Sequence, residues 1–523
     1  AVKVKWLNIL IAVGLIGAIA YKPVMSLYNK HQFESASTAV TKDAVVYGYD
    51  TWATGAVPFL GIDRGYQQDQ HLKIATKFLT SDKDRFAALG KGDIHVTEIS
   101  LPSLAVNSQE IAGGKYHDSY SVLAIADYSQ GGDGLLVGPN VKMASQAELR
   151  GKRIGYMDDG EPKFLLSFLL RMVDLRLQDV KAQPFTDEAK LQQAFTSGQL
   201  DAVFYWQPGM GDLAKKVPGS RLLISTREMA RLAPTVLIAN REWAAANQDK
   251  VQQFVNFWME TIKHIAVDPT TAYSEMADSM NKVVGPDGKV YGDVNKDDVK
   301  RIFTDEIRLV SLDENAQTLG LNGAVEQLSE TAAFTVDNWN KIQDMKPMSL
   351  DLKPQFIASI KSDPSFKPVT IDTAKGGTVA VDTTPKPKEF TQQQDASKLD
   401  PLAKISIPPI EFQPDSNALT DAGLKVINER VVPLLKQFPN LYILIDGHTD
   451  VQMPGDDAAY LMKLSQGRAD GVKAMLIRAG FSPNQILAVG HGGTQPVNKQ
   501  PKTDAEKQAN RRTEFTLLTD TKH

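Results

Sequence analysis

An acidic turn and an arginine near the C-terminus carry the residues of this sequence that are best suited to binding chemistry. The stretch DGHTDVQMPGDDAAYLMKLSQGRADGV, residues 446–472, places Asp450 after a predicted strand and Arg468 in an amphipathic helical pattern. A fixed carboxylate accepts hydrogen bonds from a cation, and a guanidinium grips a carboxylate through two parallel hydrogen bonds. The pair therefore indicates either a binding site for a charged ligand or a salt bridge inside one domain.

Length and composition limit the classes of protein. The chain has 523 residues, a formal net charge of −4 and no strongly basic run, so we expect several domains and no nucleic-acid partner. Cysteine is absent, which excludes disulfides, thiolate metal sites, cysteine nucleophiles and a lipid-modified cysteine.

The first 25 residues predict a membrane segment. Lys3 and Lys5 precede the uncharged run WLNILIAVGLIGAIAY, residues 6–21, which Lys22 closes. Lysines on the leading side predict a single-pass inner-membrane helix with the bulk of the chain in the periplasm. The alternative is a cleavable signal peptide that ends in the small residues of AIA.

From residue 44 onward, short β-rich runs such as AVVYGYD, DIHVTEISL and AVFYW alternate with amphipathic helical stretches. A strand followed by a crossover helix builds parallel sheets, and ligand crevices in such sheets lie at the strand ends. The order of AIADYSQGGDGLLVGP, ELRGKRIGY and AFTSGQLDAVFYWQP resembles the periplasmic solute-binding proteins of ABC importers, in the nitrate, sulfonate and thiamine-precursor group. The resemblance implies a module over residues 44–371, in which two α/β lobes, 44–134 plus 226–371 and 135–225, close over a small-molecule ligand.

The strand-end rule selects the ligand-binding candidates of this module. They are Asp50, Thr51, Trp52, Glu98, Ser100, Asp133 and Trp206. An oxyanion site would require Arg or Lys in these turns, so the carboxylates favour an amino-bearing ligand over a sulfonate. The two tryptophans either sandwich the ligand or pack in the core. The segment MDDGEPKF, residues 157–164, either offers free helix N–H groups to an anion or caps its helix with Asp158 and Asp159.

No catalytic constellation is recognisable in the module. Its histidines lack the spacing of a metal site and have no convincing nucleophile beside them. We therefore expect no enzymatic activity, no metal and no cofactor.

A second unit follows a change in composition. Residues 372–403 are rich in Thr, Lys, Pro, Gly and Gln, which predicts a flexible linker. The motifs FQPDSNALT, DGHTD, LSQGRADGV, AVGHGGTQPV and NRRTEF then occur in an α+β pattern over residues 404–519. They resemble, in the same order, the peptidoglycan-binding domain at the C-terminus of OmpA-like proteins.

The resemblance implies a role for the acidic turn and the arginine near the C-terminus. Asp450 and Arg468 correspond to the family's residues for the diaminopimelate stem peptide, which presents a free ammonium beside a free carboxylate. Asp450 would accept from the ammonium and Arg468 would hold the carboxylate. Thr449, Asp415 and Asn510 are expected as secondary contacts.

The sequence thus predicts a multidomain, non-enzymatic envelope protein. Its parts are an N-terminal transmembrane helix, a two-lobed periplasmic-binding-protein-like module for ligand sensing or partner docking, a flexible linker and a peptidoglycan-binding tip. One alternative is a stator subunit of an ion-driven membrane motor, although such a helix requires a carboxylate and residues 6–21 offer only Asn8. Another alternative is a solute-binding fold that serves only as a spacer. A membrane protein is a further expected partner.

Overall fold

A computed structural model describes residues 43–520, except 142–145, 173–174, 228–231, 287, 364–365, 367–369, 374–376, 381–388, 406, 408, 414 and 437. The predicted membrane helix at residues 6–21 lies outside this part of the chain. Among the described residues, no helix combines the length and the apolar character needed to span a membrane.

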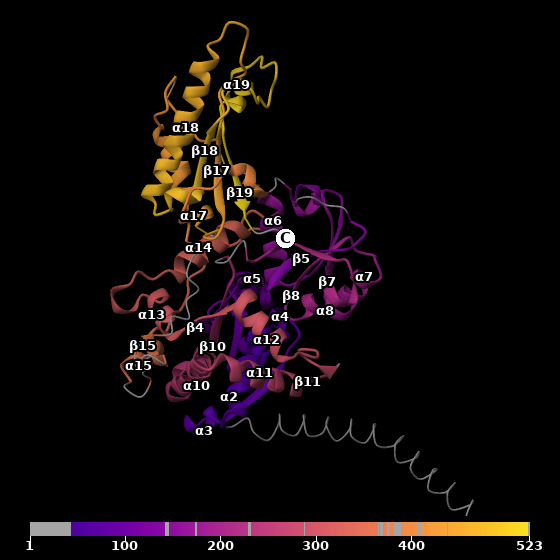
Figure 1. The fold of residues 1–523 in the computed structure, drawn as a ribbon. Helices are drawn as coiled ribbons and strands as arrows, with labels where there is room; N and C mark the ends of the chain where they lie inside the picture. Colours follow the sequence, from indigo (N-terminus) through magenta and orange to yellow (C-terminus); the bar gives the residue numbers. More distant parts are fainter. Residues whose placement is uncertain are drawn as a thin grey trace, which may run out of the picture.

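The first lobe is built on a six-stranded mixed sheet in the order β13-β4-β10-β3-β1-β2 (Figure 1). Its central strands are buried along their whole length, as expected for strands covered on both faces. The strands are β1 (Val45–Tyr49), β2 (Ile74–Phe78), β3 (Val96–Ser100), β4 (Tyr120–Ser129), β10 (Pro234–Asn240) and β13 (Ile307–Leu309). The helices are α2 (Val57–Asp63), α3 (Tyr66–Asp69), α4 (Asp82–Lys91), α5 (Leu101–Glu110), α9 (Arg241–Ala246), α10 (Gln248–Val267), α11 (Pro269–Lys282), α12 (Lys296–Arg301), α13 (Leu312–Thr318), α14 (Leu328–Trp339) and α15 (Gln355–Ser362).

The second lobe is a five-stranded sheet in the order β7-β6-β8-β5-β9. Its strands are β5 (Asp133–Val137), β6 (Arg153–Met157), β7 (Lys181–Phe185), β8 (Ala202–Trp206) and β9 (Arg221–Ser225), and its helices are α6 (Gly160–Met172), α7 (Glu188–Thr196) and α8 (Gly209–Lys216). Strand β6 pairs in parallel with β7 and β8, so the carboxyl ends of these three strands share one edge of the sheet. That edge faces the first lobe at the site described below.

Two crossing segments join the lobes, one from β4 to β5 and one from β9 to β10. They are tied to each other by the Thr226 hydroxyl, which lies 2.6 Å from Ser129 Oγ and accepts from the Gly131 N–H at 2.9 Å. Gly131 has φ +126°, a conformation that favours glycine. The polar cross-link fixes the two segments side by side at the hinge.

The C-terminal unit is a four-stranded sheet in the order β16-β19-β17-β18. Its elements are β16 (Asp400–Ile405), β17 (Tyr442–Gly447), β18 (Ile486–Gly490) and β19 (Thr513–Thr519), with helices α16 (Asp421–Val426), α17 (Val432–Leu435), α18 (Ala458–Arg478) and α19 (Asp504–Asn510). Helix α18 lies close against the sheet, because a Cβ added to Gly447 would come within 2.3 Å of the Ser465 carbonyl oxygen. Two short hairpins, β11 (Val284–Gly285) with β12 (Gly288–Lys289) and β14 (Thr370–Thr373) with β15 (Gly377–Ala380), complete the described elements.

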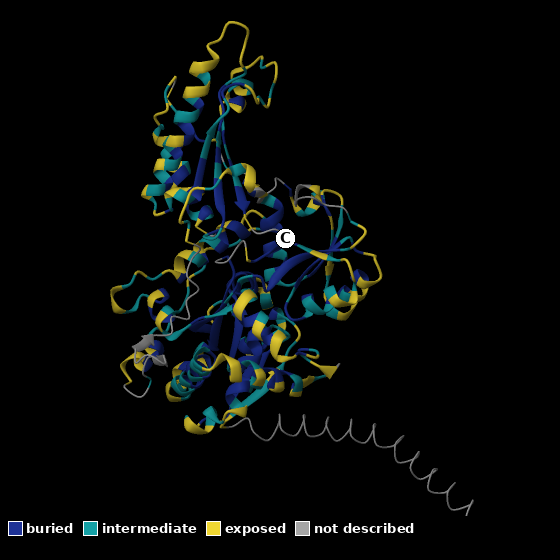
Figure 2. Cartoon of the chain, viewed as in Figure 1, coloured by how far each residue is buried: buried dark blue, intermediate teal, exposed yellow. Residues whose placement is uncertain are grey.

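The C-terminal unit packs directly on the second lobe (Figure 1). The ring of Phe438 stacks on that of Phe168 in α6, with centroids 6.4 Å apart, and both side chains belong to one buried apolar cluster. At the rim, Arg430 pairs with Asp337 of α14 at 3.2 Å. Figure 2 shows buried residues continuing from the second lobe into this unit.

The expected flexible linker over residues 372–403 is therefore wrong for its second half. Phe390 packs edge-on against Tyr442 at a centroid distance of 4.9 Å, and its carbonyl accepts from Asn484 Nδ2 at 2.9 Å. Leu399 is buried in the same small cluster, and β16 already begins at Asp400. The few apolar side chains of this polar stretch anchor it to the C-terminal sheet.

Candidate functional sites

Between the two lobes lies a cavity of about 50 Å³ at the carboxyl ends of their strands. It brings together six of the seven ligand-binding candidates selected from the sequence: Asp50, Trp52, Glu98, Ser100, Asp133 and Trp206. The seventh, Thr51, supports the wall from behind, since its hydroxyl accepts from Trp206 Nε1 at 3.1 Å. Strand-end reasoning therefore located the cavity from both lobes.

The structure adds charged residues to this cavity that the sequence analysis did not select. Asp82 and Arg85 come from the first turn of α4, where Ser81 caps the helix by accepting from the Asp84 N–H. Asp159 and Glu161 come from the start of α6 in the other lobe. The signal for the first pair was the sequence TSDKDRF directly after β2, which is itself a strand-to-helix turn.

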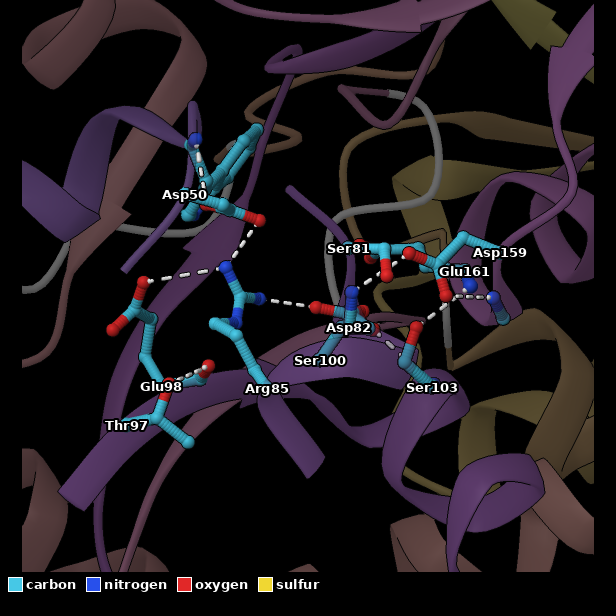
Figure 3. A network of polar contacts seen from close by, with 12 residues as sticks. Asp50, Ser81, Asp82, Arg85, Thr97, Glu98, Ser100, Ser103, Asp159 and Glu161 are labelled. Carbon is cyan, nitrogen blue, oxygen red and sulfur yellow. Dashed lines mark hydrogen bonds and ion pairs between the residues drawn. The ribbon is translucent and has the colours of Figure 1, made fainter. Parts of the chain in front are cut away.

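Arg85 is the centre of the polar network in the cavity wall (Figure 3). Its guanidinium is 3% exposed and makes close ion pairs with Asp50 and Asp82. Glu98 lies at 3.9 Å from Arg85 Nη1 and accepts a hydrogen bond from the Tyr47 hydroxyl. One arginine thus faces three carboxyl groups.

Burial raises the pKa of several cavity carboxyl groups. The pKa of Asp82 rises to about 7 through burial, with Asp159 and Asp50 adding to the rise and Arg85 opposing it. Burial raises the pKa of Glu98 to about 8 against the same Arg85 charge. The pKa of Asp133 rises to about 7 for the same main reason. The protonated forms are favoured because burial removes these groups from water and one guanidinium cannot compensate for all of them.

The lobes touch around the cavity. The Asp82 N–H donates to Asp159 Oδ2 at 2.8 Å, and the Glu161 N–H donates to Ser103 Oγ at 2.8 Å. A Cβ on Gly160 would lie 2.5 Å from Ser103 Cα, so α5 and α6 approach each other more closely than a side chain permits. The structure therefore has its lobes closed.

A second candidate site surrounds Asp450 in the C-terminal unit. Asp450 Oδ1 accepts from Asn510 Nδ2 at 3.0 Å and from the Val451 N–H at 2.8 Å, while Oδ2 pairs with Arg511 at 3.3 Å. Asn510 is fully buried and is itself bonded to both backbone groups of Asn498. This buried amide fixes the carboxylate at the edge of a groove of about 860 Å³. The groove is lined by residues that include Asp450, Tyr460, Lys499, Lys502 and Lys507.

Arg468 lies beside this site and is not paired with Asp450. Its Nε donates to the Ser416 carbonyl at 3.1 Å, and its guanidinium lies over the Phe412 ring at 5.1 Å. Within the described part of the chain, its two terminal nitrogens make no hydrogen bond or ion pair, so they remain available to a ligand. Burial and the Arg511 charge lower the pKa of Arg468, which places Arg511 next to both Asp450 and Arg468. The alternative of a direct Asp450–Arg468 salt bridge is wrong.

The two other predicted contacts hold different positions. Thr449 is 3% exposed, and its N–H donates to the Gly492 carbonyl at 2.9 Å, so it supports the turn. Asp415 is exposed, has φ +47°, and its charge acts on Arg468. Arg511 was not among the residues predicted for this site, yet it forms the ion pair with Asp450.

Comparison with known proteins assigns families to both parts of the chain. Residues 411–511 match the OmpA family, and residues 56–272 match the family described as NMT1/THI5 like. The chain carries an OmpA-family domain behind an NMT1/THI5-like module. Both resemblances drawn from the sequence motifs are thereby confirmed. The matched families are families of binding and structural proteins.

Individual relatives match one part each. The chain is 38% identical over 89 residues to outer membrane porin F of Pseudomonas fluorescens. The matched stretch covers 17% of this chain and 26% of the porin. The chain is 34% identical over 104 residues to the peptidoglycan-associated lipoprotein of Legionella pneumophila, or 20% of this chain and 56% of that protein. A protein of Brucella abortus named as a binding protein is 27% identical over 213 residues, 40% of this chain and 63% of that protein. The chain thus matches less than two thirds of each relative.

Solved structures also match the module. The alkanesulfonate-binding protein SsuA of Xanthomonas axonopodis is 16% identical with a TM-score of 0.48, and the match covers 60% of this chain and 99% of that chain. The periplasmic nitrate-binding protein NrtA of Synechocystis is 13% identical with a TM-score of 0.47, covering 62% and 90%.

Proposed function

We propose that this protein binds peptidoglycan through its OmpA-like domain and a small molecule through the cavity between the lobes of its NMT1/THI5-like module. The observation that carries the wall-binding role is the Asp450 carboxylate, held by Asn510 and Arg511 at the edge of a large groove. A relative of this domain is named a peptidoglycan-associated lipoprotein. The residues 6–21 would anchor the chain in the inner membrane, with both domains in the periplasm.

The expected ligand of the groove is the diaminopimelate stem peptide. Its ammonium would donate to Asp450, whose orientation is fixed before binding by Asn510. Its carboxylate would accept hydrogen bonds from the two terminal nitrogens of Arg468. A lysine at position 468 offers a single ammonium group and could not hold the carboxylate in this way. When the ligand binds, Arg511 would either turn from Asp450 toward the ligand or keep its ion pair with Asp450.

Co-sedimentation of the full chain with purified sacculi tests this proposal. Asp450→Asn should weaken binding at least about tenfold, because truncating one partner of a buried charged contact costs roughly 2–5 kcal/mol. Asp470→Asn is the matched control, since Asp470 is exposed on the same helix as Arg468 and, within the described part of the chain, its side chain hydrogen-bonds Gln466 alone. Wild-type binding by Asp450→Asn would remove this residue from the site.

Arg468 requires a variant that separates binding from folding. Arg468→Ala deletes the bond to Ser416 and the contact with Phe412, so it should also lower the free energy of unfolding by about 1–3 kcal/mol. Arg468→Lys retains the charge and should keep most of the stability, yet bind diaminopimelate sacculi at least about tenfold more weakly. Sacculi with lysine in place of diaminopimelate lack the second carboxylate. Equal binding of both wall types would refute the role of Arg468.

A further inference from the structure

The interlobe cavity is lined by far more acidic than basic side chains. Its lining includes six carboxyl groups, those of Asp50, Asp82, Glu98, Asp133, Asp159 and Glu161. Arg85 is the one basic side chain among the described lining residues. Asp50 and Asp82 already pair with it. Arg85 Nε and Nη1 have no hydrogen-bond partner among the described residues, but the guanidinium already forms ion pairs with Asp50 and Asp82. An incoming anion would therefore meet a paired guanidinium and an excess of carboxyl groups.

The start of α6 offers no better place for an anion. Asp159 Oδ1 accepts from the Gly160 N–H at 3.0 Å, and Ser103 Oγ accepts from the Glu161 N–H at 2.8 Å. These two N–H groups are the ones that a helix start would otherwise present to an oxyanion. Of the two aspartates in the capping alternative, Asp159 accepts a helix N–H, and the second acceptor is Ser103 rather than Asp158.

Glu98 gives an independent indication of what the cavity lacks. Its side chain is 1% exposed and lines the cavity, and its Oε1 has no hydrogen-bond partner among the residues that the structure describes. Its Oε2 is bonded to the Tyr47 hydroxyl, and the nearest basic nitrogen, Arg85 Nη1, lies 3.9 Å from Oε1. Buried acceptors of this kind are normally satisfied. The unpartnered oxygen calls for a donor from a ligand.

The two cavity tryptophans suit a cation as well. Trp52 Nε1 donates to Asp127 Oδ2 at 3.2 Å and Trp206 Nε1 donates to Thr51, so neither indole N–H is left for the ligand. Trp206 stacks on Tyr205 with ring centroids 4.7 Å apart, so the remaining π surface of the two indoles is what can attract a cation. The cavity of about 50 Å³ has room for a few water-sized groups, which suits a small head group in the closed state.

We propose that the interlobe cavity binds a small organic cation with a guanidinium or primary ammonium head, which donates to Glu98 and neighbouring carboxylates between the two tryptophans. This inference rests on the proposed small-molecule binding of the module and names its chemical class. It does not depend on the wall-binding groove.

The proposal includes a proton exchange. Without a ligand, buried Asp82, Glu98 and Asp133 hold protons up to pH values of about 7, 8 and 7, and burial also raises the pKa of Asp159 and Glu161. A bound cation favours the ionised carboxylates, so binding releases protons and tightens as the pH rises. The charged and titratable groups that face this set are Asp50, Arg85 and Lys83 from the first lobe, Asp127 at the hinge, and Tyr47 and Tyr291 behind Glu98.

Titration calorimetry on the full chain tests the proposal with methylguanidinium, methylammonium and 1,4-diaminobutane as probes. Methylurea is the neutral isostere of methylguanidinium, and methanesulfonate is the anionic comparison. We expect at least one cation to bind, with a dissociation constant at least about tenfold lower at pH 8.5 than at pH 6 and with buffer-dependent heats that report proton release. Glu98→Gln should weaken that binding at least tenfold. Glu260→Gln, a change at a partly exposed residue of α10 whose carboxylate pairs with Lys263, should leave it unchanged.

The calorimetry results can overturn the proposal that the cavity binds a cation. If no cation binds, or if methylurea binds as tightly as methylguanidinium, the proposal is wrong. Binding of methanesulfonate alone would replace the cation by an anion and leave ligand binding by the module intact. If Glu98→Gln does not fold, Asp133→Asn supplies the same comparison from the other lobe. Sacculus co-sedimentation of the same preparation reports the wall-binding proposal separately.

Discussion

The packing of the OmpA-like domain on the second lobe predicts that the two parts unfold together. Phe438 is fully buried, and its ring stacks on Phe168 of the module. Truncation of a buried phenylalanine to alanine costs about 3–5 kcal/mol. If the shared apolar cluster makes one cooperative unit, Phe438→Ala should lower the free energy of unfolding of the module by that whole amount.

Tryptophan fluorescence measures whether the substitution destabilises the module, because the tryptophans lie outside the OmpA-like domain. All six, at positions 6, 52, 206, 243, 258 and 339, precede the OmpA-like domain. Urea unfolding followed by fluorescence therefore reports on the module, although the substitution is in the other domain. The expected result is a lower urea midpoint with an unchanged slope.

The matched control removes an ion pair at the exposed rim of the same interface. Arg430 and Asp337 are each about half exposed, and such ion pairs contribute about 0.2–1 kcal/mol, so Arg430→Ala should change the fluorescence transition by less than about 1 kcal/mol. A wild-type fluorescence midpoint for Phe438→Ala, with hydrogen exchange showing a destabilised OmpA-like domain, would refute the coupling. The domains would then be stable independently.

Two further predictions concern the module. Gly160→Ala places a Cβ against the Ser103 backbone, so it should force the lobes apart, which small-angle scattering would detect as a larger radius of gyration; an unchanged radius would show that α5 and α6 can adjust locally. Without ligand, the protein should melt at a lower temperature at pH 8.5 than at pH 6, by at least about 2 °C, since roughly 1 kcal/mol shifts Tm by about 2–4 °C. The sign follows because the raised pKa values of Asp82, Glu98 and Asp133 make the folded state bind more protons than the unfolded state, so stability falls as the pH rises through about 4 to 8. A Tm that rises over this interval would contradict the buried-acid interpretation.

The sequence predicted those parts of the cavity that follow from strand order. Asp50, Glu98 and Trp206 lie in or directly after buried strands, and strands of an α/β sheet present their carboxyl ends to one crevice. Arg85 was missed because it lies inside a helix, although TSDKDRF marks a strand-to-helix turn that could have pointed to it. Glu161 lies at the start of α6 in the other lobe, and its approach to the first lobe depends on tertiary geometry that no local pattern encodes.

The docked arrangement was missed for a related reason. Phe168 and Phe438 each fit the apolar stripe of their own domain, so neither residue indicates from sequence that it faces the other domain. The polar composition of residues 372–403 favoured a flexible tether, yet Phe390 and Leu399 suffice to fix its second half to the C-terminal sheet. Composition predicts the average behaviour of a segment and overlooks isolated apolar anchors.

Docking and the proposed wall binding use opposite ends of the OmpA-like domain. The interface is made around Phe438, next to the second lobe, whereas Asn510 ends α19, which Figure 1 shows at the end of the domain farthest from the lobes. The groove at Asp450 therefore stays open while the interface is formed. Helix α14 connects the interface to both lobes: Trp339 Nε1 donates to the Pro102 carbonyl of the first lobe at 3.0 Å, and its ring packs on Phe164 of the second lobe. A wall-bound domain would thus be held at a fixed orientation to a closed module, because separating the lobes requires α14 to leave one of them.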